Sequence, residues 1–391
     1  MVNEKMKALG ETRSVIRELF EFGKILKRER GEENVFDFSL GNPSAPVPDC
    51  VNEAIENRLK DGNIHNYTSA QGDLSARAKI AEYHRNRTGI DISADNIYMT
   101  YGAASALSAV FLALNTGSCE YIAIAPFFPE YKVFTESAGG KLVAVKTKDD
   151  FSLDVDAVAA AVTEKTCCVI LNSPNNPVGN IYSEKELKAL AAALSIKRKQ
   201  TGRPIYIVSD EPYREITYGK DVPDVMNIYD DTIICYSFSK TLSLAGERIG
   251  YVAVSPKADC TGEIYSAVCG AGRALGYVCA PSLFQRVVTD CLGKTADIAV
   301  YRRNRDLIYE IVTRCGFECV KPEGAFYLFI KCPIESGKFF EICKGEGVLV
   351  VPSESFGVNG YVRLAYCVPT DVIERSAPHF EIIAKKCGLM K

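Results

Sequence analysis

Short apolar runs alternate with amphipathic stretches between about residues 95 and 255. The runs are rich in valine and isoleucine and do not alternate strictly with polar residues, which is typical of strands in a sheet covered on both faces. The predicted strands span residues 121–125, 142–146, 167–171, 204–210, 232–238 and 250–254. Strands separated by helices predict an α/β domain whose sheet is largely parallel.

The stretch from residue 183 to residue 200 illustrates the helices that separate these strands. Ser183 and Glu186 have the spacing of a capping box, in which each side chain bonds the other's backbone N–H. Basic residues crowd the last turn, where the helix dipole favours positive charge. Both features predict a helix that begins near Ser183.

The pattern changes after about residue 290. Polar and apolar positions predict helices over 295–314, over 336–344 and from 371 onward, with strands at 326–330, 348–352 and 361–366. This mixture predicts a smaller α+β domain, with which the first 45 or so residues pack. We expect a large domain over residues 46–285 and a small domain made of residues 1–45 and 286–391.

Composition narrows the classes of function. The chain has 391 residues, a net charge of −3 and no basic patch, which argues against nucleic-acid binding. No apolar run approaches the roughly 20 residues needed to cross a bilayer, and the charged N-terminus does not resemble a secretory signal. Fifteen cysteines without a CxxC pair, together with only three histidines, argue against a zinc site. We expect reduced thiols in the core of a cytoplasmic protein.

Lys240 is the first candidate for chemistry. A lysine is ordinarily a solvated surface group. Here it follows a predicted buried strand directly, with Ser237 and Ser239 beside it and Arg248 eight residues later. A lysine that forms a Schiff base must first lose its proton, and burial and neighbouring cations favour that loss.

Asp210 ends the predicted strand 204–210, which places it at the sheet edge where open α/β folds bind ligands. The alternative is a helix cap or a structural ion pair. In the functional interpretation, the carboxylate keeps a pyridine nitrogen protonated, so that the ring accepts electrons. Tyr213 lies three residues on, and we expect it to reach the phenolic oxygen of the same ring.

Three small residues, Gly102, Ala103 and Ala104, open a predicted helix. Free backbone N–H groups and the helix dipole favour an anion there, so we predict a phosphate seat. The signal is weak alone, because many helices begin with small residues. It is not a dinucleotide fingerprint, since no G-x-G-x-x-G motif is present.

Two loops after predicted strands supply further ring contacts. Asn176 lies in LNSPNNPVG, which is either an ordinary proline-rich turn or a loop that brings an amide to the ring oxygen. Phe128 lies in APFFPEY and either packs in the core or stacks on the ring.

Arg363 lies inside the apolar strand YVRLAY. A guanidinium is rarely buried without a partner, and its two-pronged geometry matches a carboxylate. We predict that Arg363 binds the α-carboxylate of a substrate; the alternative is a surface arginine on an edge strand.

Taken together, these segments resemble the fold type I, pyridoxal phosphate (PLP)-dependent aminotransferases of class I/II, with aspartate aminotransferase as the nearest type. The resemblance covers the chain from about residue 35 to its end. The motifs occur in family order as SLGNP, YTSAQG, YGAAS, PFFPEY, NSPNNPVG, SDEPY, SFSKTLSLAGERIGY and YVRLAY. The resemblance implies a large domain with a mostly parallel, seven-stranded sheet flanked by helices, plus a smaller α+β domain.

The resemblance also implies a role for each candidate. It makes Lys240 the Schiff-base lysine, and it assigns the pyridine nitrogen to Asp210 and the ring oxygen to Asn176 and Tyr213. It implies that Phe128 stacks on the ring and that the substrate carboxylate is bound by Gly41, Asn176 and Arg363. It also implies that the phosphate is bound by Gly102, Ala103, Ala104, Ser237, Ser239 and Arg248. Tyr67 would reach the phosphate bound by the neighbouring subunit, which implies a homodimer with shared sites.

The implied reaction is ping-pong transamination through an aldimine on Lys240, from an L-amino acid to a 2-oxo acid. Two alternatives stay open. The same fold and lysine serve carbon–sulfur β-lyases and decarboxylases, and a lyase needs no oxo-acid acceptor. PLP-sensing transcription regulators also carry such a domain, but they need an N-terminal DNA-binding domain that the roughly forty residues before SLGNP do not resemble.

The amino donor is the least determined feature. One branch of aspartate aminotransferases binds the distal carboxylate through a lysine in the phosphate loop, where this chain has Ala104. Another branch uses an arginine of the neighbouring subunit, about thirty residues after the Schiff-base lysine. Arg273 has nearly that spacing, which favours a dicarboxylic donor such as aspartate. Arg13 and Arg17 are further candidates.

Overall fold

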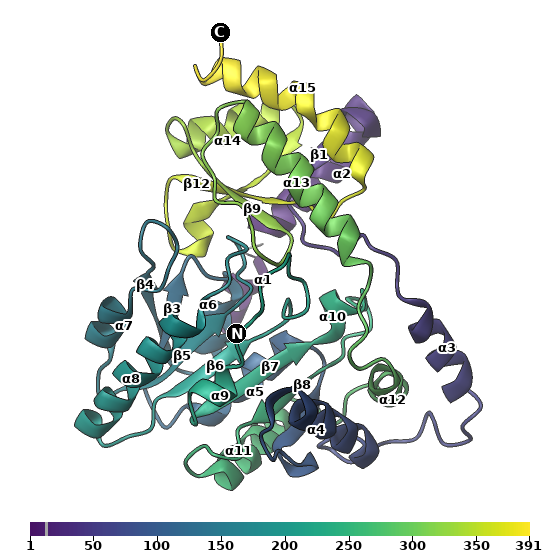
Figure 1. The fold of residues 1–391 in the computed structure, drawn as a ribbon, viewed down its shortest axis with the longest axis vertical. Coiled ribbons are helices and arrows are strands. Elements are labelled where there is room, and N and C mark those ends of the chain that lie inside the picture. Colours follow the sequence, from purple (N-terminus) through teal and green to yellow (C-terminus); the bar gives the residue numbers. More distant parts are fainter. Residues whose placement is uncertain (12–14) are drawn as a thin grey trace.

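The computed structural model of the protein describes residues 1–11 and 15–391, and within them seven strands form the largest sheet, in the order β2-β8-β7-β6-β5-β3-β4 (Figure 1). Its strands are β2 (Ile97–Thr100), β3 (Glu120–Ala125), β4 (Lys141–Lys146), β5 (Thr166–Asn172), β6 (Tyr206–Asp210), β7 (Thr232–Ser237) and β8 (Gly250–Val254). The pairs β3–β4, β3–β5, β5–β6 and β6–β7 are parallel. The predicted α/β fold with a mostly parallel sheet is confirmed.

Strand β8 is the exception, because it is antiparallel to both β7 and β2. Only the short helix α10 (Phe238–Thr241) lies between β7 and β8, and a parallel connection would need a longer crossover. The sequence pattern does not reveal β2, since a run of four residues is too short to show periodicity.

Helices cover both faces of this sheet. On one face, α5 (Ala103–Leu114) and α11 (Thr261–Ala274) pack on alternate strand residues such as Ala123 and Val252. The other face is covered in two parts, around Ile122 and around Ile234. Its helices are α3 (Asp49–Arg58), α4 (Leu74–Thr88), α7 (Val155–Ala161), α8 (Glu184–Thr201), α9 (Val225–Ile228) and α12 (Ser282–Asp290). Burial of both faces explains why the strands are apolar throughout.

Helix α8 has the predicted capping box. The Ser183 side chain accepts a hydrogen bond from the Glu186 backbone, and Glu186 accepts one from the Ser183 backbone N–H at 2.7 Å. Gly202 ends the helix in the left-handed conformation, at φ 67°.

A second body of structure combines the C-terminal part of the chain with a segment from its N-terminal part (Figure 1). Its central strands are β11 (Val351–Pro352), β12 (Tyr361–Ala365) and β9 (Tyr327–Lys331), which are antiparallel, and β1 (Phe36–Asp37) pairs with β10 (Val348–Leu349). Its helices are α2 (Val15–Arg30), α13 (Ile298–Arg314), α14 (Ser336–Gly345) and α15 (Thr370–Lys386). Helix α1 (Glu4–Glu11) has no buried residue and lies against the large body instead, where Lys5 Nζ donates to the Glu136 carbonyl at 2.8 Å. Phe36 and Phe38 share one core with Ile308 and Phe380, so the N-terminal segment packs with the C-terminal part.

The domain boundary at residue 285 stays a prediction. It falls inside α12, whose Val287 and Val288 are buried in the same cluster as Val51 and Ala54 of α3.

A backbone seam joins the two bodies. Glu323 and Gly324 donate from their backbone N–H groups to the Gly179 carbonyl, at 2.8 and 2.9 Å. Tyr218 donates to the Glu323 carbonyl at 2.9 Å, beside an antiparallel bridge between Thr217 and Gly324. The segment at Glu323 is therefore held between two loops of the large sheet.

All fifteen cysteines are free thiols. Among the described residues, no helix has the length and apolar character that a bilayer crossing requires. Over the same residues, no three His, Cys, Asp or Glu side chains are grouped as a metal ion would need.

Candidate active site

The candidate residues gather at one edge of the seven-stranded sheet. Asp210 ends β6 and Ser237 ends β7, and these parallel strands place their carboxyl ends side by side. Gly250, at the start of the antiparallel strand β8, pairs with both Ser237 and Thr100. This register brings the segments that contain Gly102 and Arg248 to the same edge.

Gly102, Ser237, Ser239 and Arg248 converge there on one small cradle. A Cβ atom on Gly102 would lie 3.0 Å from Arg248 Nη2 and 3.4 Å from Ser237 Oγ, and the glycine has φ of +90°. The Ser237 hydroxyl donates to Ser239 Oγ at 2.8 Å, and Arg248 Nη1 donates to the same oxygen at 3.3 Å. Only glycine fits between these groups without strain.

Helix α5 adds backbone donors to this cradle. Ala103 and Ala104 form its first turn, where backbone N–H groups have no partner within the helix. Arg248 is exposed, so its guanidinium is open to a ligand. The combination of a helix N-terminus, two hydroxyls and a cation suits a phosphate-sized anion.

The amine of Lys240 faces a carbonyl rather than a carboxylate. It donates to the Gly41 carbonyl at 2.7 Å and lies 5.6 Å from the centre of the Phe326 ring. The pKa of Lys240 is lowered to about 8, chiefly by burial. Cys367 opposes this shift, and the charges of Arg248 and Arg363 contribute to it. The neutral amine that a Schiff base requires is therefore accessible near neutral pH.

Asp210 is a buried carboxylate with one oxygen occupied and one free. Its Oδ2 accepts a hydrogen bond from Tyr131 Oη at 2.5 Å. Its Oδ1 is buried and has no partner among the described residues. Burial raises the pKa of Asp210 to about 7; the Tyr131 hydrogen bond lowers it and nearby Glu211 raises it. A buried acceptor without a donor is costly, so this oxygen is suited to a donor supplied by a ligand.

Side-chain amides fix the loop after β5 against Asp210. Asn172 donates from Nδ2 to the Asp210 carbonyl at 2.9 Å, and its Oδ1 accepts from the Asn176 backbone at 2.8 Å. Asn176 Oδ1 in turn accepts from Arg363 Nη1 at 3.2 Å. Because the oxygen of this amide faces Arg363, its Nδ2 points away from the arginine.

Arg363 is an uncompensated buried cation. It is 2 % exposed, and no carboxylate lies within ion-pair distance of it among the described residues. Its Nη2 donates to the Ser39 carbonyl, and its guanidinium lies 4.6 Å from the centre of the Tyr327 ring. Its Nε has no hydrogen-bond partner in the part of the chain that the structure describes. Burial lowers its pKa. Such a group favours a ligand that carries a carboxylate.

Tyr213, Gly41 and Phe128 also lie in this region. The Tyr213 and Tyr327 hydroxyls are hydrogen-bonded at 2.8 Å, and burial raises the pKa of Tyr213 well above its usual value. A Cβ atom on Gly41 would lie 2.1 Å from Tyr327 Oη, so no larger residue fits there. Phe128 is partly exposed, with its ring edge-on to Tyr131 at 5.7 Å.

Tyr67 and Arg273 make no hydrogen bond to this group within the described part of the chain. Tyr67 is 92 % exposed, between α3 and α4. Arg273 is exposed near the end of α11, and Arg17 is exposed on α2. Arg13 lies outside the described residues.

Sequence reasoning missed Tyr131 and Tyr327. Tyr131 lies three residues after Phe128, in the first turn of α6 (Glu130–Ser137), and that spacing places both on one side of the turn. Tyr327 is diagonal to Arg363 across the β9–β12 pair, where Arg363 is opposite Phe329. The pairing of those two strands was the signal needed, and it is not visible in a single sequence.

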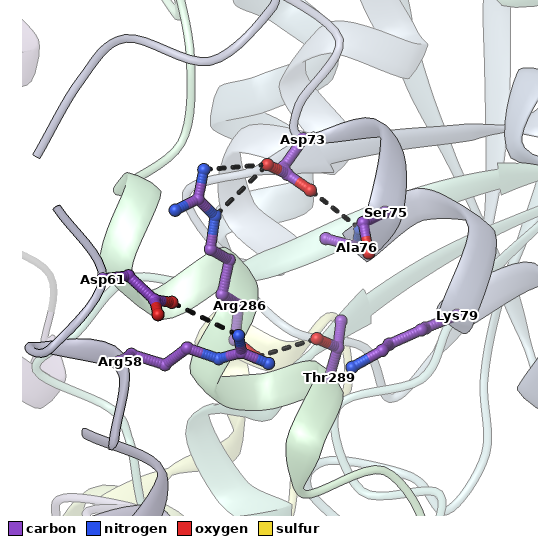
Figure 2. A pocket seen from close by; sticks show the side chains of 8 residues that line it. All are labelled: Arg58, Asp61, Asp73, Ser75, Ala76, Lys79, Arg286 and Thr289. Atoms are coloured by element: carbon purple, nitrogen blue, oxygen red, sulfur yellow. Dashed lines mark hydrogen bonds and ion pairs between the residues drawn. The ribbon is translucent and has the colours of Figure 1, made fainter. Parts of the chain in front are cut away.

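A separate cavity lies between α3, α4 and α12 (Figure 2). It has a volume of about 290 Å³ and contains Arg58, Lys79 and Arg286. Arg286 is paired with Asp73 at 3.2 Å, and Arg58 with Asp290 at 2.8 Å. Its charges neutralise one another, so nothing in it requires a ligand.

Comparison with known proteins gives a consistent result. The family model for aminotransferase class I and II matches residues 33–380. An amino transferase from Eubacterium rectale has a crystal structure with a TM-score of 0.97 and 52 % identity over 99 % of both chains. Aspartate aminotransferase from Thermus thermophilus with maleate has a TM-score of 0.86 and 25 % identity, over 98 % of this chain and 99 % of its own. A probable aspartate aminotransferase of Methanocaldococcus jannaschii is 31 % identical, over 93 % of this chain and 95 % of its own.

Proposed function

This chain belongs to the class I and II aminotransferase family and is an aminotransferase, and we propose that it moves an amino group from an L-amino acid to a 2-oxo acid in two half-reactions, with pyridoxal phosphate as its cofactor. The observation that carries this proposal is the buried Oδ1 of Asp210, which has no partner among the described residues. It lies at the sheet edge shared with Lys240 and the anion cradle at Gly102.

The residues present suit the cofactor at each of its ends. The cradle of Gly102, Ser237, Ser239 and Arg248 would hold the phosphate, with the first turn of α5 completing the donors. Asp210 Oδ1 would accept the N–H of a protonated pyridine, and Asn176 Nδ2 and Tyr213 Oη would serve the ring oxygen. When bound, the cofactor supplies an electron sink for the bond broken at the Cα atom of the substrate.

Lys240 supplies the amine and the proton transfer. Its lowered pKa leaves a substantial neutral fraction near neutral pH, so that Nζ is a nucleophile and a base. Its contact is with the Gly41 carbonyl, which accepts a hydrogen bond without trapping the amine in an ion pair. Lys240 would thus attach the cofactor and later carry the proton removed from Cα.

Arg363 orients the substrate. The guanidinium is anchored by the Ser39 carbonyl and the Asn176 amide oxygen, while its Nε remains without a partner among the described residues. A substrate α-carboxylate supplies the anion that this buried cation lacks. The ring of Tyr327 lies 4.6 Å from the guanidinium, within the range of a cation–π contact.

We propose a homodimer in which Tyr67 contributes to the partner's phosphate site. Tyr67 is 92 % exposed. Two apolar side chains on neighbouring segments are also exposed, Leu74 at 63 % and Val278 at 59 %. These segments are joined by the Ser282 hydroxyl, which donates to the Ile64 carbonyl at 2.6 Å. Large apolar side chains that are exposed on neighbouring segments favour a protein–protein interface.

We propose a dicarboxylic amino donor such as aspartate. Arg273 is exposed near the end of α11, shortly before the exposed Val278, which supports its reaching the neighbouring subunit's substrate. The Thermus thermophilus enzyme was solved with maleate, a dicarboxylate. In Arg273→Ala, kcat/KM for aspartate should fall about 10²-fold while that for an apolar donor is retained. Unchanged aspartate turnover would sink the donor assignment.

A test of the main proposal joins a chemical and a kinetic measurement. Addition of pyridoxal phosphate should give a visible absorption band, and borohydride should fix the cofactor on Lys240, located by peptide mass. In Lys240→Ala the fixed adduct should be absent and turnover should fall at least about 10⁴-fold.

The kinetic arm separates transfer from elimination. A panel of L-amino acids with 2-oxoglutarate should give oxo acids only when the acceptor is present. Release of pyruvate from cystathionine or cysteine without an acceptor would instead identify a carbon–sulfur β-lyase.

A further inference from the structure

Tyr131 occupies a position that neither the ring contacts nor the phosphate cradle accounts for. It lies in the first turn of α6, directly after the loop that follows β3. Its hydroxyl donates to Asp210 Oδ2 at 2.5 Å, between two side chains that are 1 % and 5 % exposed. A hydrogen bond from a phenol to a buried carboxylate is strong, because neither group has water as an alternative partner.

Within the described part of the chain, the Asp210 carboxylate makes one hydrogen bond, which is the bond from Tyr131. The neighbouring amide of Asn172 bonds the Asp210 backbone carbonyl, at 2.9 Å, and leaves the carboxylate untouched. Glu211 is the nearby acid, and it is paired with Arg214 at 3.2 Å and bonded by the Ser209 hydroxyl at 2.8 Å. Tyr131 therefore fixes which oxygen of Asp210 is occupied and which is left free.

The ring of Tyr131 is itself immobilised. Phe127 stacks on it with ring centres 6.4 Å apart and planes inclined by 24°, and Phe128 lies edge-on at 5.7 Å. Burial raises the pKa of the Tyr131 phenol well above its usual value, so the group stays a donor. The loop after β3 thus carries the predicted ring-stacking aromatic, Phe128, and the first turn of α6 carries Tyr131, the donor to Asp210.

We propose that Tyr131 is a positioning residue, which holds Asp210 Oδ2 so that Oδ1 is presented to the ring nitrogen of the cofactor and stabilises positive charge there. This inference rests on the proposed function. Its effect is exerted through Asp210 alone, and it vanishes for a ligand that has no nitrogen at that position.

The test pairs a substitution with an altered cofactor. Tyr131→Phe removes the hydroxyl and keeps the ring that Phe127 and Phe128 pack against. Apoprotein is titrated with pyridoxal phosphate and, separately, with the analogue in which the ring nitrogen is replaced by C–H, and binding is followed by absorbance. Tyr131→Phe should bind pyridoxal phosphate about tenfold more weakly than the unmodified protein. Both proteins should bind the analogue equally.

Tyr121→Phe is the matched control. Tyr121 lies on β3 and is fully buried, like Tyr131. Its hydroxyl donates to the Phe111 carbonyl at 2.6 Å and makes no bond to Asp210. This variant should change neither titration. A cooperative thermal transition in each variant shows that the titrated protein is folded.

Several outcomes overturn the inference. Equal weakening with both cofactors would mean that the hydroxyl only stabilises packing. Unchanged binding of pyridoxal phosphate by Tyr131→Phe would mean that Asp210 is oriented without it. If the unmodified protein forms no borohydride adduct on Lys240, the proposed function fails first and this inference falls with it.

Discussion

Two regions of this protein contain arginines whose charges differ in their partners. In one region the arginines are paired with carboxylates, and in the other a buried arginine is not. In the cavity of Figure 2, Arg58 and Arg286 each face a carboxylate at hydrogen-bond distance. At the sheet edge, Arg363 is almost fully buried and contacts a carbonyl, an amide oxygen and aromatic rings. The cavity has a volume of about 290 Å³, yet its charges are already paired within the chain.

The difference indicates that unpaired buried charge is a better guide to a ligand site than the presence of a cavity. Burying a cation without a counterion costs stability, and proteins retain such a group where a ligand completes it. Asp210 follows the same logic with opposite sign, since one of its buried oxygens has no donor among the described residues. A paired surface cation, by contrast, contributes little and requires nothing.

The largest effect that tests this contrast is expected at Arg363. In Arg363→Gln, kcat/KM for every amino donor should fall about 10² to 10³-fold, because the variant loses the charge that we propose binds the α-carboxylate. The free energy of unfolding without substrate should change by no more than about 1 kcal/mol, since an uncompensated charge is removed. Steady-state kinetics and urea unfolding measure the two. A large loss of stability with intact kinetics would reverse the interpretation.

A second, smaller effect concerns pH. Burial lowers the pKa of Lys240 to about 8. Below that pH, the fraction of Lys240 in the neutral form rises about tenfold per pH unit, and above it the fraction levels off. The rate at which apoprotein forms a borohydride-trappable adduct with pyridoxal should follow this curve from about pH 6 to about pH 10. With a lysine of ordinary pKa, about 10.4, the rate of adduct formation would still be rising at about pH 10.

The two measurements are linked through Arg363. Its positive charge is one cause of the lowered Lys240 pKa, so Arg363→Gln should move the midpoint of the pH curve upward. A midpoint that stays fixed in this variant would show that the two cations are electrostatically independent.

The smallest effect is expected in the paired region. Arg58→Gln should leave kcat and KM unchanged and lower the free energy of unfolding by at most about 1 kcal/mol. Asp290 keeps a partner in that variant, because Lys79 Nζ lies 3.0 Å from it. The same assays serve here, and a kinetic defect as large as that of Arg363→Gln would erase the contrast between the regions.

Much of the large sheet was predictable because its strands report their own surroundings. Runs such as 167–171 and 250–254 are apolar throughout, since both of their faces are covered, and that property is local in the sequence. Asp210 was predictable for a related reason, because a polar residue that ends a buried strand must lie at a sheet edge.

The order of the strands was not predictable, and the remaining site depends on it. Gly102 meets Arg248 only because β8 runs antiparallel between β2 and β7. Tyr131 meets Asp210 because α6 follows β3, which is separated from β6 by β5 alone. Periodicity reports which face of a strand is buried, but it carries no information on which strand lies beside it.

The seam at Gly179 has a consequence for recombination between relatives. The segment that begins at Glu323 and the loop that contains Asn176 and Gly179 belong to distant parts of the gene, yet they share backbone hydrogen bonds. A crossover between their codons would combine two surfaces from different parents, and a Cβ atom on Gly179 would lie only 2.7 Å from Pro322. Functional chimaeras should therefore inherit both segments from one parent.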